Sequence, residues 1–338
     1  MNIVFICTNY NSIKCGIGMY TFNLVQEFEK IKDINIEIIE ENTFEFSKIK
    51  RFFNINILKK IIKYINKNKE NKKQKLNFII EYPFMDWSFF NLIGIFLLKK
   101  YFKNSILILS IHEYDRVSYF RKKATEFLMK ISDKFIITDE NLKKILPNKE
   151  ILLREIPSNI KKVNLLKPVI KLENNYCFFG LINKAKAFDE MLEAWKKFNL
   201  SKNYILNIYT SSNIEVKSLE EYNIKVFKDL NNEELSIELQ KNSFMLLPIL
   251  PNINSNNGTL KAAATHGCIP IGIFSNSINF LGVNILDKKY TIQNIEKALE
   301  ETLKINKKEE ISKLEKYSIN FSFENNSKKI YKNLLRGE

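Results

Sequence analysis

The sequence alternates short apolar runs with longer stretches in which apolar residues recur at helical spacing, and this alternation constrains the fold more than any other feature. Such alternation is typical of parallel sheets whose strands are joined by crossover helices. In the first half, we expect strands at 3–7, 34–39, 78–81, 106–111, 135–138 and 151–154. The second half repeats the pattern, with strands expected at 176–179, 205–209, 224–227, 244–248 and 269–273. The sequence therefore predicts an α/β fold built from two Rossmann-like halves.

Helices are expected between these strands. Apolar spacing predicts helices at 19–28, 55–65, 118–131, 188–198, 218–221, 233–241 and 258–266, and the segment 291–335 is helical and charged with a break at 318–324. The stretch 157–174 contains Pro168 and has weak periodicity, so we place an interdomain linker there. The expected organisation is an N-terminal domain at 1–165, a second domain at 172–315 and a terminal segment at 316–338.

Composition excludes several classes of protein. With 338 residues, of which 45% are hydrophobic, the chain can bury a large core. Four widely spaced cysteines and two histidines support neither a disulfide framework nor a structural zinc site, so we expect a reducing, cytoplasmic compartment. No secretory signal is expected, and the longest apolar run, 87–98, is shorter than the roughly 20 residues that span a bilayer.

The formal net charge is +15, and the segment 1–170 alone carries +12. A basic first half suits an anionic partner, namely a nucleic acid, an anionic membrane surface or a phosphorylated substrate. The alternative is that abundant Lys, Asn and Ile follow from an AT-rich genome. No nucleic-acid-binding module is recognisable, and aromatic residues are not interleaved with the basic runs, so no nucleic-acid partner is expected.

Two candidate ligand-binding features follow predicted strands of the first half. Gly16 and Gly18 lie just before a predicted helix, where glycine lets a ligand approach the backbone and the first N–H groups attract anions. A tight turn alone also explains them, and no third glycine completes the dinucleotide pattern GxGxxG. His112 follows the strand at 106–111, at the sheet edge where such folds bind ligands. His112 is a candidate site residue, with Glu113, Asp115 and Arg116 next to it in the sequence. The alternative is that His112 is only a packed or solvated side chain.

Two further loops mark the second half. Lys184 and Lys186 come between a predicted strand and a helix, where ammonium groups and helix-start amides can hold a phosphate together. In the loop after 244–248, Asn257 is expected to cap a helix that Gly258 and Thr259 open. The alternative for the loop of Lys184 and Lys186 is that it is only solvated. The alternative for Asn257 is an ordinary helix cap without a ligand. Together with the loop that contains Gly16 and Gly18, these are three candidate anion-binding loops at strand ends in two domains. Their combination favours a binding site.

These segments resemble the GT-B glycosyltransferases, specifically the retaining family 4-like group, over nearly the whole chain. The segment 16–24 resembles the family's glycine-rich loop and first helix, and 156–160 resembles the end of its N-terminal domain. The spacing of glycine, lysine and aspartate in 179–189 matches the family, as does 267–271 at the end of its signature helix. The segment 321–324 resembles the start of the crossing C-terminal segment. The resemblance implies two Rossmann-like domains facing each other across a cleft, with a C-terminal helix that crosses back to the N-terminal domain.

Two departures concern donor recognition. Most members carry an arginine between the glycine and the lysine of the first motif, where this chain has Leu181 and Asn183. The family's paired glutamates would fall at Asn254 and Ala262, and neither is acidic. Donor recognition therefore differs here, and we expect polar residues of the same loop to replace the glutamates.

The resemblance implies transfer of a sugar from a nucleotide-diphosphate donor, bound by the second domain, to a glycan or lipid-linked acceptor bound by the first. The implied pathway is synthesis of a bacterial surface polysaccharide, with retention of configuration, no metal and no cofactor. Cations and helix-start amides would stabilise the leaving diphosphate. The implied catalytic residues are His112 and Lys186. The implied donor-binding residues are Gly16, Gly18, Asn183, Lys184, Ser255, Asn256, Asn257, Gly258, Thr259 and Leu260.

Two further interpretations remain open. The basic stretch 55–65, with Lys59, Lys60 and Lys63, can lie on anionic lipid, so we expect a cytoplasmic protein that can associate with the inner membrane face. Loss of both signature glutamates is also compatible with a catalytically weak GT-B subunit that binds a glycan or stabilises a partner glycosyltransferase.

Overall fold

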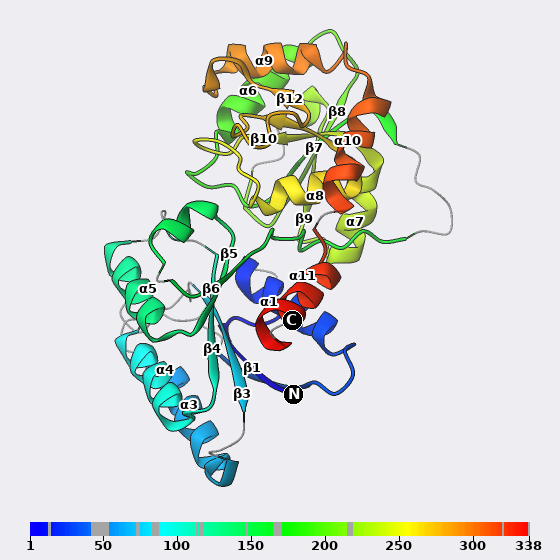
Figure 1. Ribbon diagram of the computed structural model, residues 1–338. Helices are drawn as coiled ribbons and strands as arrows, with labels where there is room; N and C mark the ends of the chain where they lie inside the picture. Colours follow the sequence, from blue (N-terminus) through cyan, green and yellow to red (C-terminus); the bar gives the residue numbers. More distant parts are fainter. Residues whose placement is uncertain are drawn as a thin grey trace. The chain divides into compact units, whose positions relative to one another are not determined.

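The computed structural model describes residues 1–12, 15–41, 54–71, 75–82, 88–112, 114, 118–146, 148–164, 171–214, 219–319 and 321–336 (Figure 1). The chain divides into two compact units. The first unit comprises Met1–Glu155 together with Phe323–Glu338, and the second comprises Ile156–Ser322. Because the last helical segment belongs to the first unit, the second unit is inserted within the first along the sequence.

The first unit is built on a six-stranded sheet in the order β2-β1-β3-β4-β5-β6, and every neighbouring pair is parallel. The strands are β1 (Asn2–Thr8), β2 (Asn35–Glu41), β3 (Leu76–Tyr82), β4 (Ile106–Ile111), β5 (Lys134–Ile137) and β6 (Glu150–Leu153). Strands β1, β3 and β4 are almost entirely buried, as expected for a parallel sheet covered on both faces.

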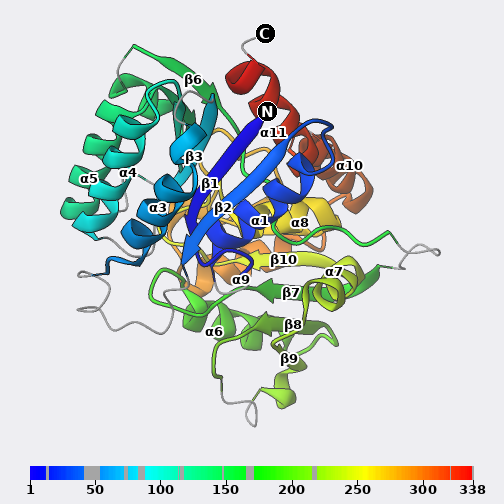
Figure 2. The ribbon, with the colours of Figure 1, turned by 90° about the horizontal axis from the view of Figure 1, so that it is seen from below.

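Helices cover both faces of this sheet. On one face lie α3 (Asn56–Lys67), α4 (Phe89–Tyr101) and α5 (Tyr119–Ile131), and on the other lie α1 (Gly16–Phe28) and α11 (Phe323–Ile330) (Figure 2). Short helical turns are η1 (Lys69–Asn71), η2 (Glu140–Lys144) and the π-helical η5 (Tyr331–Arg336). Helix α3 turns Ile57, Ile61 and Tyr64 into the core, so its lysines form the exposed face. Helix α11 packs on α1, which confirms the expected return of the C-terminal segment.

Long-range hydrogen bonds fix the returning segment to the first unit. Lys134 Nζ donates to the Leu334 carbonyl at 2.7 Å, and Asn326 Nδ2 donates to the Glu155 carbonyl at 2.9 Å. Strand β5, which lies between β4 and β6, and the end of the first stretch of chain are therefore both held by residues that come after the second unit.

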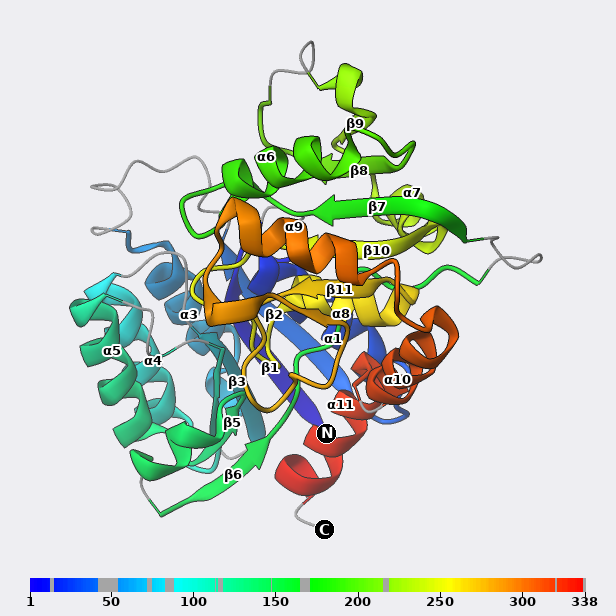
Figure 3. The ribbon, with the colours of Figure 1, turned by 90° about the horizontal axis from the view of Figure 1, so that it is seen from above.

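The second unit has the same kind of sheet, with parallel strands in the order β12-β11-β10-β7-β8-β9 (Figure 3). The strands are β7 (Leu172–Phe179), β8 (Ile205–Thr210), β9 (Ile224–Lys228), β10 (Asn242–Leu247), β11 (Ile269–Gly272) and β12 (Val283–Asn284). The helices are α6 (Phe188–Asn199), α7 (Asn232–Lys241), α8 (Gly258–His266), α9 (Ile292–Glu301) and α10 (Lys307–Ile319), with short turns η3 (Glu220–Tyr222) and η4 (Leu286–Lys288). Trp195 and Tyr176 are at the centre of its aromatic core, with ring centroids 5.1 Å apart.

The prediction of two Rossmann-like α/β halves is confirmed, with local differences. Helix α4 was not predicted, because its sequence is apolar on nearly every side and lacks amphipathic spacing. The short helix expected at 218–221 is a single 3-10 turn, η3, and residues 215–218 lie outside the described part of the chain. The expected linker 157–174 is irregular where it is described up to 164, but β7 already begins at Leu172. Among the described residues, no helix is long and apolar enough to cross a membrane.

Candidate functional site

The carboxyl ends of β1, β3 and β4 meet at one edge of the first sheet. The chain leaves β1 toward β2 on one side, and β3 lies on the other, so a topological switch point falls between β1 and β3. Open α/β sheets bind ligands in the crevice outside such a point. The glycine loop follows β1 and His112 follows β4, so both sequence-predicted features of this half are at this edge.

The two glycines of the first loop have different environments. A Cβ added at Gly18 would lie 1.8 Å from the backbone oxygen of Asn9, so only glycine lets helix α1 start this close to the loop. The Gly18 N–H is also capped by the Cys15 sulfur at 3.3 Å. A Cβ at Gly16 would meet nothing within 4 Å. Gly18 therefore serves backbone packing, while Gly16 is at the open start of the helix.

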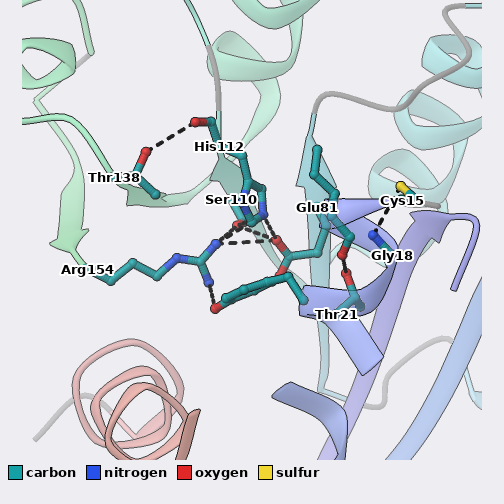
Figure 4. A network of polar contacts seen from close by, with 10 residues as sticks. Cys15, Gly18, Thr21, Glu81, Ser110, His112, Thr138 and Arg154 are labelled. Carbon is teal, nitrogen blue, oxygen red and sulfur yellow. Dashed lines mark hydrogen bonds and ion pairs between the residues drawn. The ribbon is translucent and has the colours of Figure 1, made fainter. Parts of the chain in front are cut away.

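His112 is part of a buried polar cluster (Figure 4). Its Nε2 lies 2.6 Å from Oε2 of Glu81, at the end of β3. Ser110, two residues before His112, donates from Oγ to the same carboxylate oxygen at 2.5 Å. Arg154, directly after β6, donates from Nη2 to Ser110 Oγ at 2.7 Å and lies 3.5 Å from Glu81 Oε2. The side chains of Glu81 and Arg154 are 0% exposed and that of His112 is 5% exposed.

Electrostatics keep the Glu81 carboxyl ionised. Burial by itself would raise the pKa of Glu81, but the Arg154 charge and the hydrogen bonds from His112 and Ser110 outweigh burial and lower that pKa below its ordinary value. An ionised carboxylate only accepts hydrogen bonds, so the short contact to His112 requires a proton on Nε2. The cluster thus determines the tautomer of the histidine.

Tyr20 connects the cluster to the helices on that face of the sheet. Arg154 Nη1 donates to the Tyr20 hydroxyl, and the guanidinium carbon lies 4.4 Å from the centre of the tyrosine ring. The Tyr20 ring packs edge-on against His112 with centroids 4.9 Å apart and lies 5.3 Å from the ring of Phe323 in α11. Burial raises the pKa of the Tyr20 hydroxyl, which stays protonated. Residues from α1, β3, β4 and α11 therefore hold one histidine in place.

In the second unit, the loops after β7 and β10 meet at the switch point between these adjacent strands. Lys186 forms an isolated bridge with Ile249, and the Ala187 N–H donates to the Pro248 carbonyl at 2.9 Å. Gly180 directly follows β7 and has a φ of +125°. A Cβ there would lie 2.7 Å from Lys186 Nζ and 3.9 Å from Thr259 Oγ1. The structure thus brings together Lys186 and Thr259, which are far apart in sequence.

Lys186 is a partly buried cation in this loop. Burial lowers the pKa of its ammonium to about 8. Its Nζ lies over the ring of Phe178, 4.8 Å from the centroid. Among the described residues, no salt bridge joins Lys186 to a carboxylate. A desolvated cation whose charge is not balanced by a carboxylate is a site for an anionic ligand.

The polar loop before α8 supplies backbone groups beside this lysine. Asn257 caps the helix by accepting from the Leu260 N–H at 2.9 Å, and Asn254 accepts from the Asn256 N–H at 3.1 Å. Gly258 and Thr259 are the first residues of α8, whose N–H groups lie outside the helix's own hydrogen bonds. The first turn contains no acidic residue. This helix start therefore presents a positive end toward the loop.

The remaining sequence-predicted residues have varied positions. Asn183 and Lys184 are exposed, and Asn183 Oδ1 accepts from the Ala185 N–H at 3.0 Å. Ser255 and Asn256 are partly exposed. Leu260 is fully buried in the core and its N–H is already bonded to Asn257, which leaves it no group for a ligand. Glu113, Asp115 and Arg116 lie outside the described residues.

Sequence reasoning missed Glu81, Ser110, Arg154 and Tyr20. Glu81 and Ser110 lie within apolar runs that predict strands, and an acidic residue inside a buried strand was an available signal. Arg154 and Tyr20 carry no local signal, since their contacts are with residues more than 40 positions away. Within the described ranges, no group of three or more His, Cys, Asp or Glu side chains is placed to hold a metal ion.

No protein-family model and no curated protein sequence matches this chain. Solved structures do match it over nearly its whole length. WaaG, a glycosyltransferase involved in lipopolysaccharide biosynthesis, is 11% identical, with a TM-score of 0.61 and 100% of both chains covered. An α-glucosyltransferase in complex with UDP-glucose and DNA containing an abasic site is 14% identical, with a TM-score of 0.63, covering 98% of this chain and 100% of that one. A UDP-N-acetylglucosamine 2-epimerase is 11% identical, with a TM-score of 0.63, covering 99% and 96%. The chain has the GT-B fold.

Proposed function

We propose that this protein is a glycosyltransferase that moves a sugar from a nucleotide-diphosphate-sugar donor to a glycan or lipid-linked acceptor. The observation that carries the proposal is the Lys186 ammonium, which lies partly buried at the switch point of the second sheet, next to Gly180 and the start of α8. A diphosphate is the anion that a single cation and two helix-start amides are suited to hold. The GT-B neighbours include proteins described as glycosyltransferases, one of them bound to UDP-glucose.

In the proposed reaction, the second unit stabilises the leaving group. Cleavage of the anomeric bond leaves negative charge on the diphosphate, and Lys186 with the N–H groups of Gly258 and Thr259 would offset that charge as it develops. His112 of the first unit would contact the donor sugar or the acceptor hydroxyl. Retention of anomeric configuration and reaction without a metal are part of this proposal.

The proposed acceptor class is membrane-linked or surface polysaccharide, and the surface of α4 and α5 supports it. These helices expose aromatic side chains on the first unit, Phe89, Phe96, Tyr119, Phe120 and Phe127, and the rings of Phe96 and Phe127 lie 6.5 Å apart. Exposed Lys100, Lys103, Lys123 and Lys130 lie on or beside the same helices. Exposed aromatic side chains on helices that also expose lysines suit the interface of an anionic bilayer.

A donor panel tests the enzyme proposal. Purified protein is incubated with uridine, guanosine, adenosine, cytidine and thymidine diphosphates and their sugar conjugates, and thermal stability and donor consumption are measured. Stabilisation by one nucleotide, together with its release from the matching sugar conjugate, is expected. The absence of both binding and donor consumption across the panel would rule the proposal out. Consumption of the donor with interconversion of its sugar, and no transfer or hydrolysis, would instead indicate an epimerase.

The membrane part of the proposal has its own test. Flotation with vesicles of 30% phosphatidylglycerol in phosphatidylcholine is expected to recover the wild-type protein, and Phe96→Ser with Phe127→Ser is expected to weaken recovery. The matched control is Leu200→Ser, which changes an apolar residue that is 78% exposed in the second unit. Equal recovery with neutral and anionic vesicles, or none with either, contradicts the membrane proposal.

A second candidate function is that of a subunit with weak activity of its own, which stabilises a partner glycosyltransferase. It is favoured by the two positions where the family resemblance implies glutamates, because Asn254 is exposed and neutral and Ala262 is buried. Co-purification with a second glycosyltransferase, combined with nucleotide binding but no donor turnover by this chain alone, would favour this candidate.

A further inference from the structure

The cluster around His112 contains more charge than a structural histidine requires. Glu81 and Arg154 are both fully buried, and removal of two charges from water is costly unless the pair is well bonded. The second histidine of the chain, His266, provides a comparison. His266 is also buried, but its partners are the neutral Ser236 hydroxyl and the Ala262 carbonyl. A charged pair is therefore not needed to bury a histidine in this protein.

The two histidines are also held in opposite tautomers. Ala262 offers His266 Nδ1 only a carbonyl at 2.8 Å, which requires a proton on Nδ1. Glu81 offers His112 Nε2 a carboxylate at 2.6 Å, which requires a proton on Nε2. Arg154 Nη2 lies 3.1 Å from the same nitrogen, but it donates to Ser110 Oγ over a shorter distance. The carboxylate therefore determines that His112 Nε2 carries the proton.

We infer that Glu81 is the positioning residue of His112, fixing the proton on Nε2 so that the imidazole meets a substrate hydroxyl through Nδ1 as a hydrogen-bond acceptor. Arg154 and Ser110 hold the Glu81 carboxylate in place and ionised. The inference rests on the proposed function, because it gives His112 a role toward a sugar or acceptor hydroxyl. The tautomer itself is a property of the free protein and does not depend on that role.

Among the described residues, further titratable groups face the cluster from β1, from α1 and from the end of β6. Cys7 on β1 lies close enough to Glu81 for the carboxylate to raise its pKa further, after burial, so the thiol stays neutral. Tyr20 on α1 is likewise neutral, and Arg154 is the cation that faces Glu81. Within this set, substitution of Glu81 leaves Arg154 as an unbalanced positive charge beside the imidazole.

The first measurement is the long-range ¹H–¹⁵N spectrum of the two histidines in the free wild-type protein near pH 7. We expect one Nε2-protonated ring with a strongly downfield Nε2 proton and one Nδ1-protonated ring, and His266→Gln assigns the second. A His112 protonated on Nδ1 would overturn the inference whatever the activity of the protein.

The second measurement compares Glu81→Gln with Glu41→Gln. Glu41 is a buried carboxylate at the end of β2 that accepts from Asn54 and Asn56 and does not touch His112, so it is the matched control. In Glu81→Gln, we expect the Nε2 proton to move upfield, kcat for donor turnover to fall by about 100-fold and nucleotide affinity to stay unchanged.

Ser110→Ala is the milder variant should Glu81→Gln fail to fold, and we expect it to weaken the Nε2 proton shift and reduce kcat less. An unchanged His112 spectrum and unchanged kcat in Glu81→Gln would overturn the inference while leaving the proposed function intact. If the wild type shows the expected tautomer but neither transfers sugar nor consumes any donor, the proposed function fails and the assignment of Glu81 to the His112 tautomer stands.

Discussion

Replacement of Lys186 by alanine should sharply weaken the binding of a nucleotide diphosphate to the second unit. A hydrogen bond to a charged group contributes about 1.5 to 3 kcal/mol, which corresponds to a loss in affinity of about 10- to 150-fold. The upper part of this range applies here, because the ammonium is desolvated and lies beside the start of α8. Lys225→Ala is the matched control, since Lys225 is an exposed lysine on β9 of the same unit, outside the two loops.

The loss is measured by thermal stabilisation. A nucleotide at 100 times its dissociation constant adds about 2.7 kcal/mol to the wild type, and a 30-fold loss of affinity leaves about 0.9 kcal/mol at the same concentration. For a unit of this size, these values correspond to shifts in Tm of about 5 to 11 °C and about 2 to 4 °C. A Lys186→Ala protein with the full wild-type shift would refute the assignment of this lysine to the diphosphate.

The pH dependence provides an independent check. Because burial lowers the pKa of Lys186 to about 8, the ammonium is charged below that pH and loses its charge as the pH rises through it. Nucleotide affinity is therefore expected to fall between pH 7 and pH 9 in the wild type. Lys186→Arg keeps its charge over this range and should lose that pH dependence. A wild-type affinity that stays constant from pH 7 to pH 9 would contradict the argument.

Three other changes have expected outcomes. Gly180→Ala should weaken nucleotide binding in the same thermal assay and lower stability by about 1 to 3 kcal/mol, because its Cβ would be 2.7 Å from Lys186 Nζ at a φ of +125°. Burial lowers the pKa of His266 to about 4. The unfolded chain therefore binds the extra proton between pH 6.5 and 4, and urea unfolding should show the second unit losing about 2 to 3 kcal/mol over that window; a His266→Gln protein should show a flatter pH dependence. Lys261 is fully buried, with Nζ 2.9 Å from the Tyr317 hydroxyl and 3.5 Å from the centre of the Phe321 ring. Tyr317→Phe should cost about 1 to 3 kcal/mol in denaturant unfolding, whereas a stability equal to that of the wild type would show that the hydroxyl contributes little.

Periodicity predicted the strands well because nearly every strand residue is buried in a parallel sheet that is covered on both faces. Such strands are visible in the sequence as continuous apolar runs. Helix α4 escaped prediction for the same reason, since a helix with apolar residues on most sides has no face that spacing can reveal. Element boundaries shifted by a few residues, as at β7, where Leu172 and its polar neighbours join the sheet through pairing rather than through hydrophobicity.

The candidate site was predictable only where its residues follow strands. Lys186, Thr259 and His112 were found because loops at the carboxyl ends of parallel strands are ligand-binding positions. Glu81 and Arg154 were not found, because their role depends on pairing between strands and on a charge network that joins residues 73 positions apart. Leu260 was assigned to the donor from its place at the start of α8, but its side chain is in the core and its N–H is bonded to the cap.

The insertion of one unit within the other has a consequence for how the protein is made. The strands of the first unit leave the ribosome before α11, and the whole of Ile156–Ser322 is synthesised in between. At about 5 to 20 residues per second, this interval is about 10 to 30 s. During that interval, the face of α1 against which Phe323 packs is uncovered, and Lys134 lacks the Leu334 carbonyl. The half that is translated first therefore completes its folding last, and premature termination anywhere in the second unit yields a nascent chain with an open apolar face for chaperones to recognise.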